Sequence, residues 1–203
     1  MPKTGWAWRR ATTTMALATL LAVGGCVGAE PADVPTTPTA EETPTPTPSA
    51  TADLTRLPER PAAMAEPTTD GAIAAATYVL DLYGYSFATA DLGPWRAVVL
   101  DTCEFCNGVS ETVEQMMADG QTSSGSGVTI VSARAVEISE DRWFSVEMEI
   151  LQGPSTRYGS DGAVVGHGDG GHYNAVFALS WSEGWRVDEM GVELFDNVPT
   201  APE

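Results

Sequence analysis

The stretch Phe144-Ser-Val-Glu-Met-Glu-Ile150 decides the fold class, because apolar and polar residues alternate along it. A period of two is typical of a β-strand with one buried face and one solvated face. The four apolar residues would face the core, and the serine and two glutamates between them would face water. The second half of the chain is therefore expected to form a sheet that is buried on one side.

The segments on either side of this strand continue the pattern. Val128 to Ile138 predicts a preceding strand, joined through Ser139-Glu-Asp141. A third strand is predicted from a row of alternate inward residues, and Ser182-Glu-Gly184 turns the chain into a fourth strand from Trp185. The inward row of the third strand is Tyr173, Ala175, Phe177, Leu179 and Trp181. Short turns between long strands predict a four-stranded antiparallel meander.

Helical periodicity precedes the strands. Thr69-Asp70 can cap a helix from Gly71 to about Ala90, because its apolar residues recur at spacings of three and four. The stripe expected to be buried is Ile73, Ala76, Leu80, Tyr83, Phe87 and Ala90. Gly84 inside this helix indicates a bend or the close approach of another segment.

Two further helices are expected before the sheet. A short one, with Pro94 in its first turn, covers Trp95 to Leu100. Asp101, with Glu104 three residues later, resembles a capping box and predicts a helix that ends at Gly120.

Residues 121–127, rich in Ser and Gly, are expected to form a flexible loop between the helices and the strands. Helices first and strands after predict an α+β fold. The N-terminal helices would pack on one face of a curved, four-stranded antiparallel sheet.

The stretch Leu21-Ala-Val-Gly-Gly-Cys26 predicts where the protein resides. Lys3, Arg9 and Arg10 precede an apolar region of about 13 residues, which is too short to span a bilayer. The pattern predicts a lipoprotein signal peptide over residues 1–25, with Cys26 acylated by fatty chains such as palmitate. The protein would then be lipid-anchored at the extracytoplasmic face of the cell membrane. The alternative is an ordinary secretory signal in which Cys26 is incidental.

Composition divides the remainder of the chain. Residues 26–66 are rich in Pro, Thr, Ala and Glu and nearly lack bulky apolar residues, so a disordered tether is expected. Residues 67–203 carry the helix and strand patterns and are expected to form a single domain.

Charge excludes one class of partner. The chain has 10 Lys and Arg against 28 Asp and Glu, a net charge of −18, and its one lysine is Lys3. Such a surface repels phosphate backbones, so no nucleic-acid partner is expected.

Cys103 and Cys106 are the other two cysteines of the chain. An even pair in an oxidising compartment predicts a disulfide that pins the start of a helix. The alternatives are a thiol-disulfide redox site, free thiols or a metal site. The redox alternative has physical support because a helix N-terminus lowers the pKa of a thiol, but a thioredoxin-like site needs a preceding strand and not a helix.

The run Gly166-His-Gly-Asp-Gly-Gly-His172 contains both histidines of the chain. Two imidazoles and Asp169 could ligate a metal, but a glycine-rich loop lacks the rigid spacing of a helical site. A hydrated hairpin connection is therefore expected, and no metal or cofactor is predicted.

Tyr78, Asp81 and Tyr85 share one face of the first helix. If that face looked into the mouth of a cone, they would form a ligand-binding site over an apolar floor from Phe177 and Trp181. A buried Asp81 would have a raised pKa and could serve as a general base. The alternative places the tyrosines in the core and Asp81 in solvent.

Several of these features occur together in a known family. Gly71-Ala72, then Tyr78, Tyr85, Ala88 and Asp91, then Cys103-x-x-Cys106, follow a lipoprotein signal and a Pro/Thr-rich linker. Over residues 67–195 the chain resembles the actinobacterial lipoproteins of domain-of-unknown-function family 6318. The element order also resembles the NTF2-like (cystatin-like) cone. The resemblance implies a cell-surface lipoprotein and no assigned activity.

The function expected from the sequence is non-catalytic binding of a small molecule or an envelope protein. No catalytic residue is predicted, because Asp81 has no histidine or lysine at a neighbouring helical position. The alternatives are an enzyme that uses an acid or base in the same pocket and a CxxC redox protein.

Overall fold

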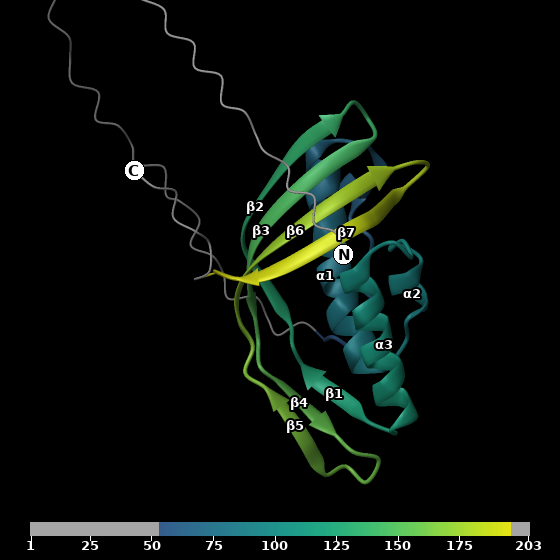
Figure 1. Cartoon of the computed structure of the whole chain (residues 1–203), viewed down its shortest axis with the longest axis vertical. Coiled ribbons are helices and arrows are strands. Elements are labelled where there is room, and N and C mark those ends of the chain that lie inside the picture. The colour runs from purple at the N-terminus through teal and green to yellow at the C-terminus, as the bar shows by residue number, and fades with distance from the viewer. Residues whose placement is uncertain (1–52, 196–203) are drawn as a thin grey trace, which may run out of the picture. The chain divides into compact units, whose positions relative to one another are not determined.

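The structure is a computed structural model, and it describes residues 53–195. The predicted signal peptide 1–25, Cys26 and residues 27–52 of the predicted tether lie outside the described residues. The described part is α+β, with helices followed by antiparallel strands (Figure 1).

A four-stranded antiparallel sheet forms the larger part of the β-structure. Its strands are β2 (Val128–Ser139), β3 (Trp143–Gln152), β6 (Gly171–Trp181) and β7 (Trp185–Leu194), in the spatial order β2-β3-β6-β7. The predicted antiparallel pairing of the four strands in chain order is confirmed, but β3 and β6 are joined through residues 153–170 and not by a short turn. All four apolar residues of the opening stretch are buried. On β6 the central residues of the predicted inward row are buried, and Tyr173 and Trp181 at its ends are half-buried.

A second, smaller sheet was not expected. It has the order β1-β4-β5 and consists of β1 (Thr122–Gly125), β4 (Ser155–Tyr158) and β5 (Val164–Gly168). Two predictions need correction: residues 121–127 contain a strand, and the glycine-rich run at 166–172 ends β5 and begins β6, with only Asp169 and Gly170 connecting them. The hairpin turn lies earlier, where the Gly159 amide donates to the Ala163 carbonyl at 2.8 Å.

The chain crosses between the two sheets three times, and glycines lie at the crossings. It passes from β1 into β2, from β3 into β4 and from β5 into β6, and it changes direction at each crossing (Figure 1). Gly125 and Gly170 adopt positive φ angles of 86° and 74°. A Cβ atom on Gly125 would lie 2.2 Å from the Pro154 carbonyl oxygen, and one on Gly170 would lie 2.2 Å from that of Gln152. These glycines therefore let two strands approach while both bend.

The helices are η1 (Ala62–Ala65), α1 (Thr69–Thr89), α2 (Gly93–Arg96) and α3 (Glu104–Ala118). The three expected helices are present, with different ends. The cap of α1 is Thr68, whose Oγ1 accepts a hydrogen bond from the Gly71 amide at 3.0 Å. Cys103, and not Asp101, is the residue that precedes α3, and its Sγ accepts from the Cys106 amide.

The helices cover one face of the main sheet, and α1 lies at the centre of the core. Only Ala76 and Leu80 of its predicted stripe are buried, and the other four residues are half-buried. The most deeply buried row lies on an adjacent face and comprises Ala72, Ala75, Val79, Leu82 and Ser86. This second row is buried because α1 packs against the strands on one side and against η1, α2 and α3 on another.

The folded part begins earlier than the predicted boundary at residue 67. Met64 in η1 belongs to the hydrophobic core with 5% of its surface exposed. Leu54 packs against α1, where a Cβ atom on Gly84 would lie 3.0 Å from its Cδ2 atom. The range expected for the tether, 26–66, therefore overlaps the fold, and Gly84 marks a close approach.

Candidate functional site

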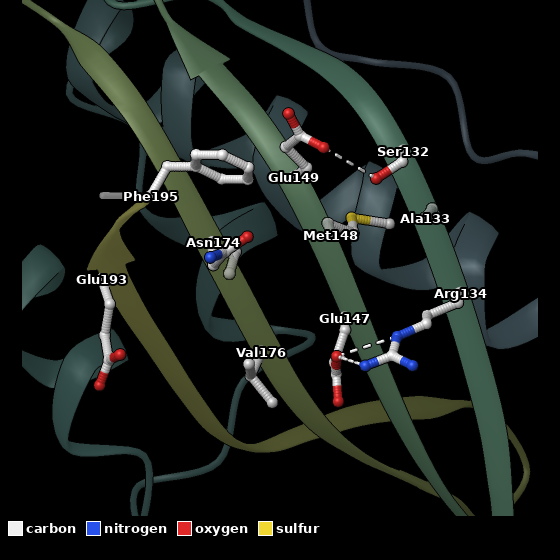
Figure 2. Close-up of a pocket in the computed structure, with 11 residues that line it drawn as sticks. Ser132, Ala133, Arg134, Glu147, Met148, Glu149, Asn174, Val176, Glu193 and Phe195 are labelled. Atoms are coloured by element: carbon white, nitrogen blue, oxygen red, sulfur yellow. Dashed lines mark hydrogen bonds and ion pairs between the residues drawn. The ribbon is translucent and has the colours of Figure 1, made fainter. Parts of the chain in front are cut away.

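The face of the main sheet opposite the helices is open and carries a hollow of about 810 Å³ (Figure 2). We call it the open-face groove. It is lined by Ser132, Arg134, Glu147, Glu149, Asn174, Val176, Glu193 and Phe195.

Strand register builds this groove. Pairing across the four strands places Ser132, Glu149, Asn174 and Glu193 in one row. The next row is Arg134, Glu147, Val176 and Gly191. Directly opposed residues on one face of a sheet are close enough for their side chains to interact.

Glu149 is held at both carboxylate oxygens. Its Oε1 lies 2.8 Å from the Nε2 of His172, and its Oε2 accepts a hydrogen bond from the Ser132 hydroxyl at 3.3 Å. The His172 ring also stacks on Phe195, with centroids 4.0 Å apart and planes 7° apart. Arg134 forms an ion pair with Glu147, in which its Nε lies 2.9 Å from Oε2. The polar side chains are therefore positioned before any partner binds.

Apolar side chains lie beside these charges. Val176 is 45% exposed and Phe195 is 37% exposed. Three carboxylates lie with a single guanidinium in the groove, so its net charge is negative. A negative groove with exposed apolar groups can bind a polypeptide segment that carries both basic and apolar side chains.

The order Ser132, Glu149, His172 does not support nucleophilic catalysis. In a catalytic triad the imidazole lies between the hydroxyl and the carboxylate, because it must take the proton of the nucleophile. Here the carboxylate lies between the other two groups. The imidazole therefore has no contact with the hydroxyl that it would have to deprotonate.

The structure does not bring the five residues of the predicted pocket together. Phe177 is fully buried in the core, and the half-buried Trp181 packs edge-on against Trp185. Tyr78 is buried, with the Arg60 guanidinium carbon 5.8 Å from its ring centroid. The open-face groove and four other hollows in residues 53–195 are lined by none of the five.

Asp81 and Tyr85 lie toward solvent on α1. Asp81 is exposed, yet the neighbouring protein displaces enough water to raise the pKa of its carboxyl above the ordinary 3.8. Tyr85 donates a hydrogen bond to Asp91 Oδ2 at 3.0 Å, and this bond raises the pKa of the phenol. The helix-covered side of the sheet instead contains an apolar space of about 50 Å³ beside Tyr83, whose pKa is raised by burial.

Cys103 and Cys106 form the expected disulfide, and both residues are fully buried. The indole of Trp95 donates to the Cys106 carbonyl at 3.3 Å. Buried sulfur atoms lack the access that thiol-disulfide exchange requires. The geometry therefore favours a structural disulfide at the start of α3.

The two histidines have separate partners. His172 contacts Glu149 of the open-face groove, whereas Nδ1 of His167 lies 3.4 Å from the Thr156 hydroxyl on the small sheet. Within the described range, no group of three or more His, Cys, Asp or Glu side chains is placed to hold a metal ion. No helix in residues 53–195 is both long and apolar enough to cross a membrane.

Sequence reasoning missed the open-face groove. The alternation at Ser145, Glu147 and Glu149 indicated a polar face, but the partners of these residues depend on strand register. A bulge between Ile130 and Ser132 shifts the pairing of β2, so spacing alone could not identify Ser132.

Comparison with known proteins gives the family. No curated protein matches the sequence. Among solved structures, the intermembrane space region of the chloroplast protein ARC6 is similar at 12% identity and a TM-score of 0.48, over 63% of this chain and 97% of that one. Residues 39–191 match the family of unknown function DUF6318. The chain belongs to this family.

Proposed function

We propose that this protein is a cell-surface lipoprotein whose domain binds another polypeptide in the open-face groove. The observation that carries the proposal is the fixed Glu149, held by His172 and Ser132 beside the exposed Val176 and Phe195. Fixed charges next to exposed apolar groups reduce the ordering that binding would otherwise require.

The partner is a segment with Lys or Arg next to apolar residues. Charge complementarity supports this chemistry, because the groove has three carboxylates and the chain carries −18 overall. A second copy of the chain fits less well, since it would place one acidic groove against another. An envelope protein with a basic, exposed segment has the required charge.

The lipid anchor at Cys26 places this domain at the extracytoplasmic face of the membrane, and the NTF2-like cone is the fold arrangement we propose for it. The support is the signal pattern that ends in Cys26, since the residue lies outside the described structure. Replacing Cys26 by Ala should release the protein from the membrane fraction or stall its processing. A mutant that remains processed and membrane-bound would disprove the anchor.

The binding proposal is tested by titrating the purified protein with fluorescein-labelled peptides and measuring anisotropy. A peptide of alternating lysine and leucine should bind, and one of alternating glutamate and leucine should not. Glu149→Gln combined with Glu193→Gln should weaken binding of the basic peptide at least about tenfold, because two groove carboxylates are lost.

The matched control is Glu140→Gln combined with Glu183→Gln, which removes the same charge from two exposed turns. It should leave the affinity nearly unchanged at moderate salt, since distant exposed charges are screened. Equal losses in the two double variants would show that only net charge attracts the peptide, and the groove would not be the site.

A further inference from the structure

A second hollow lies between the helices and the small sheet, away from the open-face groove. Its volume is about 130 Å³. Phe87 of α1 and Thr112 and Met116 of α3 line one side, and Ser123, Ser155 and Arg157 of the small sheet line the other. We call this hollow the Arg157 cleft.

Register explains why the polar residues gather on one face. Ser123 pairs with Arg157, and Arg157 pairs with Gly166, so the three share a row across β1, β4 and β5. Ser155 pairs with Gly168 in the next row of the same face. His167, between the two glycines, also lines the hollow, and its Nδ1 lies 3.4 Å from the Thr156 hydroxyl.

The two glycines provide the room for Arg157. A Cβ atom on Gly166 would lie 3.5 Å from Nη2 of Arg157, and one on Gly168 would lie 2.7 Å from the Ser155 hydroxyl oxygen. Side chains at these positions would fill the wall of the cleft. The glycine-rich run therefore leaves the Arg157 guanidinium and the Ser155 hydroxyl uncovered.

Arg157 has no acidic partner within residues 53–195, whereas Arg56, Arg96 and Arg134 each form an ion pair with a glutamate. In the same range, no hydrogen bond is made by the side chain of Ser123, Ser155 or Arg157. Arg60, Arg142 and Arg186 likewise form no ion pair in that range, so what distinguishes Arg157 is its place in a hollow beside two hydroxyls. A guanidinium presents paired donors that match the two oxygens of a carboxylate.

Acidic groups lie next to the cleft. An adjoining hollow of about 360 Å³ shares Thr112, Met116 and Arg157 with it and adds Glu111 and Asp119. Asp119 accepts a hydrogen bond from the Gln115 amide at 3.0 Å. Arg157 therefore lies where the two hollows meet, with Glu111 and Asp119 in one hollow and the apolar side chain of Phe87 in the other.

We infer that the Arg157 cleft binds a free amino acid with an apolar side chain. The carboxylate pairs with the Arg157 guanidinium and accepts from the hydroxyls of Ser123 and Ser155. The apolar side chain packs on Phe87 and Met116. The ammonium group faces Glu111 and Asp119, which also attract it over a longer range.

The test uses three small molecules that separate the groups of the ligand: leucine, 4-methylpentanoate without the amine, and 3-methylbutylamine without the carboxylate. Binding to the purified protein is measured by calorimetry and by the shift of the Met116 methyl signal in an NMR spectrum, assigned with Met116→Leu. Leucine should bind most tightly, the carboxylate more weakly, and the amine not at all up to about 10 mM.

Variants give the second arm of the test. Arg157→Gln should weaken leucine and 4-methylpentanoate alike by at least about tenfold, and Arg157→Lys should weaken them less. Glu111→Gln should affect leucine only. The control is Arg142→Gln, a change of the same charge in the exposed turn between β2 and β3. Equal binding by the parent and Arg157→Gln, or no binding by any of the three molecules, would overturn the inference.

Discussion

The Nε2 atom of His172 lies 2.8 Å from the Oε1 atom of Glu149, across two adjacent strands of the main sheet. The same imidazole stacks on Phe195, the residue that follows β7. One side chain therefore fixes both a carboxylate of the open-face groove and an aromatic ring at its end.

His172→Ala should lower the affinity for a basic peptide at least about threefold, because Glu149 and Phe195 lose their fixed positions. The free energy of unfolding should fall by less than about 1 kcal/mol, since the pair is partly exposed. The comparison is His167→Ala, which removes an equivalent ring from the small sheet and should leave peptide affinity unchanged. Equal affinities in all three proteins would show that His172 does not organise the groove.

The boundary between the two sheets gives a prediction from a pair of glycines. Gly162 and Gly170 have similar positive φ angles of 79° and 74°, but a Cβ atom would meet nothing within 4 Å at Gly162. Gly162→Ala should therefore cost only the backbone strain, about 1 kcal/mol. Gly170→Ala adds the clash with the Gln152 carbonyl and should cost more than about 3 kcal/mol.

Urea unfolding followed by tryptophan fluorescence measures both glycine variants. Equal losses of unfolding free energy would mean that the close approach of Gly170 to β3 does not contribute to stability.

The early start of the fold predicts the effect of truncating Met64. Met64→Ala should lower the free energy of unfolding by about 2 to 4 kcal/mol, because a buried side chain is replaced by a cavity. Leu57→Ala, in the same segment but 48% exposed, should change it by less than about 0.5 kcal/mol. If both variants matched the parent in urea unfolding, residues 53–66 would not be part of the folded unit.

Asp81 gives a prediction about pH. Desolvation raises the pKa of its carboxyl, so the folded state holds this proton more tightly than the unfolded chain. Ionised Asp81 is therefore less stable in the folded protein than in the unfolded chain, and this lowers the free energy of unfolding. The loss is absent below the unfolded pKa of 3.8 and complete above the folded pKa. Through this group alone, the free energy of unfolding falls as pH rises across that interval.

Asp81→Asn removes the cost. The variant should be more stable than the parent at pH 7, by less than about 1 kcal/mol because the carboxylate is exposed, and the difference should vanish near pH 3. Urea unfolding at several pH values measures it. A variant less stable than the parent at pH 7 would show that the ionised carboxylate is stabilising.

The strands of the main sheet were predictable because their signal is local. The alternation around Phe144 records burial on one face, and it needs no knowledge of the partner strands. The strands of the small sheet have no such signal. β1 consists of Thr, Ser and Gly, and β5 has glycine at alternate positions, so neither has a row of apolar residues to reveal it.

The candidate site was less predictable than the fold. The predicted pocket assumed that Tyr78 and Asp81 face the sheet, but the packing of α1 against three helices turns its most buried row elsewhere. The open-face groove joins residues from four strands, and its rows depend on register and on one bulge. These are tertiary properties, which a spacing pattern within one segment does not contain.

The most direct test of the account compares two exposed valines. Val176 lies in the open-face groove, and Val164 lies on β5 with a similar exposure of 52%. Val176→Arg and Val164→Arg add the same charge, so they alter long-range attraction equally. The dissociation constant of the lysine–leucine peptide should rise at least about tenfold for Val176→Arg and stay within about twofold of the parent for Val164→Arg. Equal dissociation constants for the two variants would contradict the assignment of the open-face groove as the binding site.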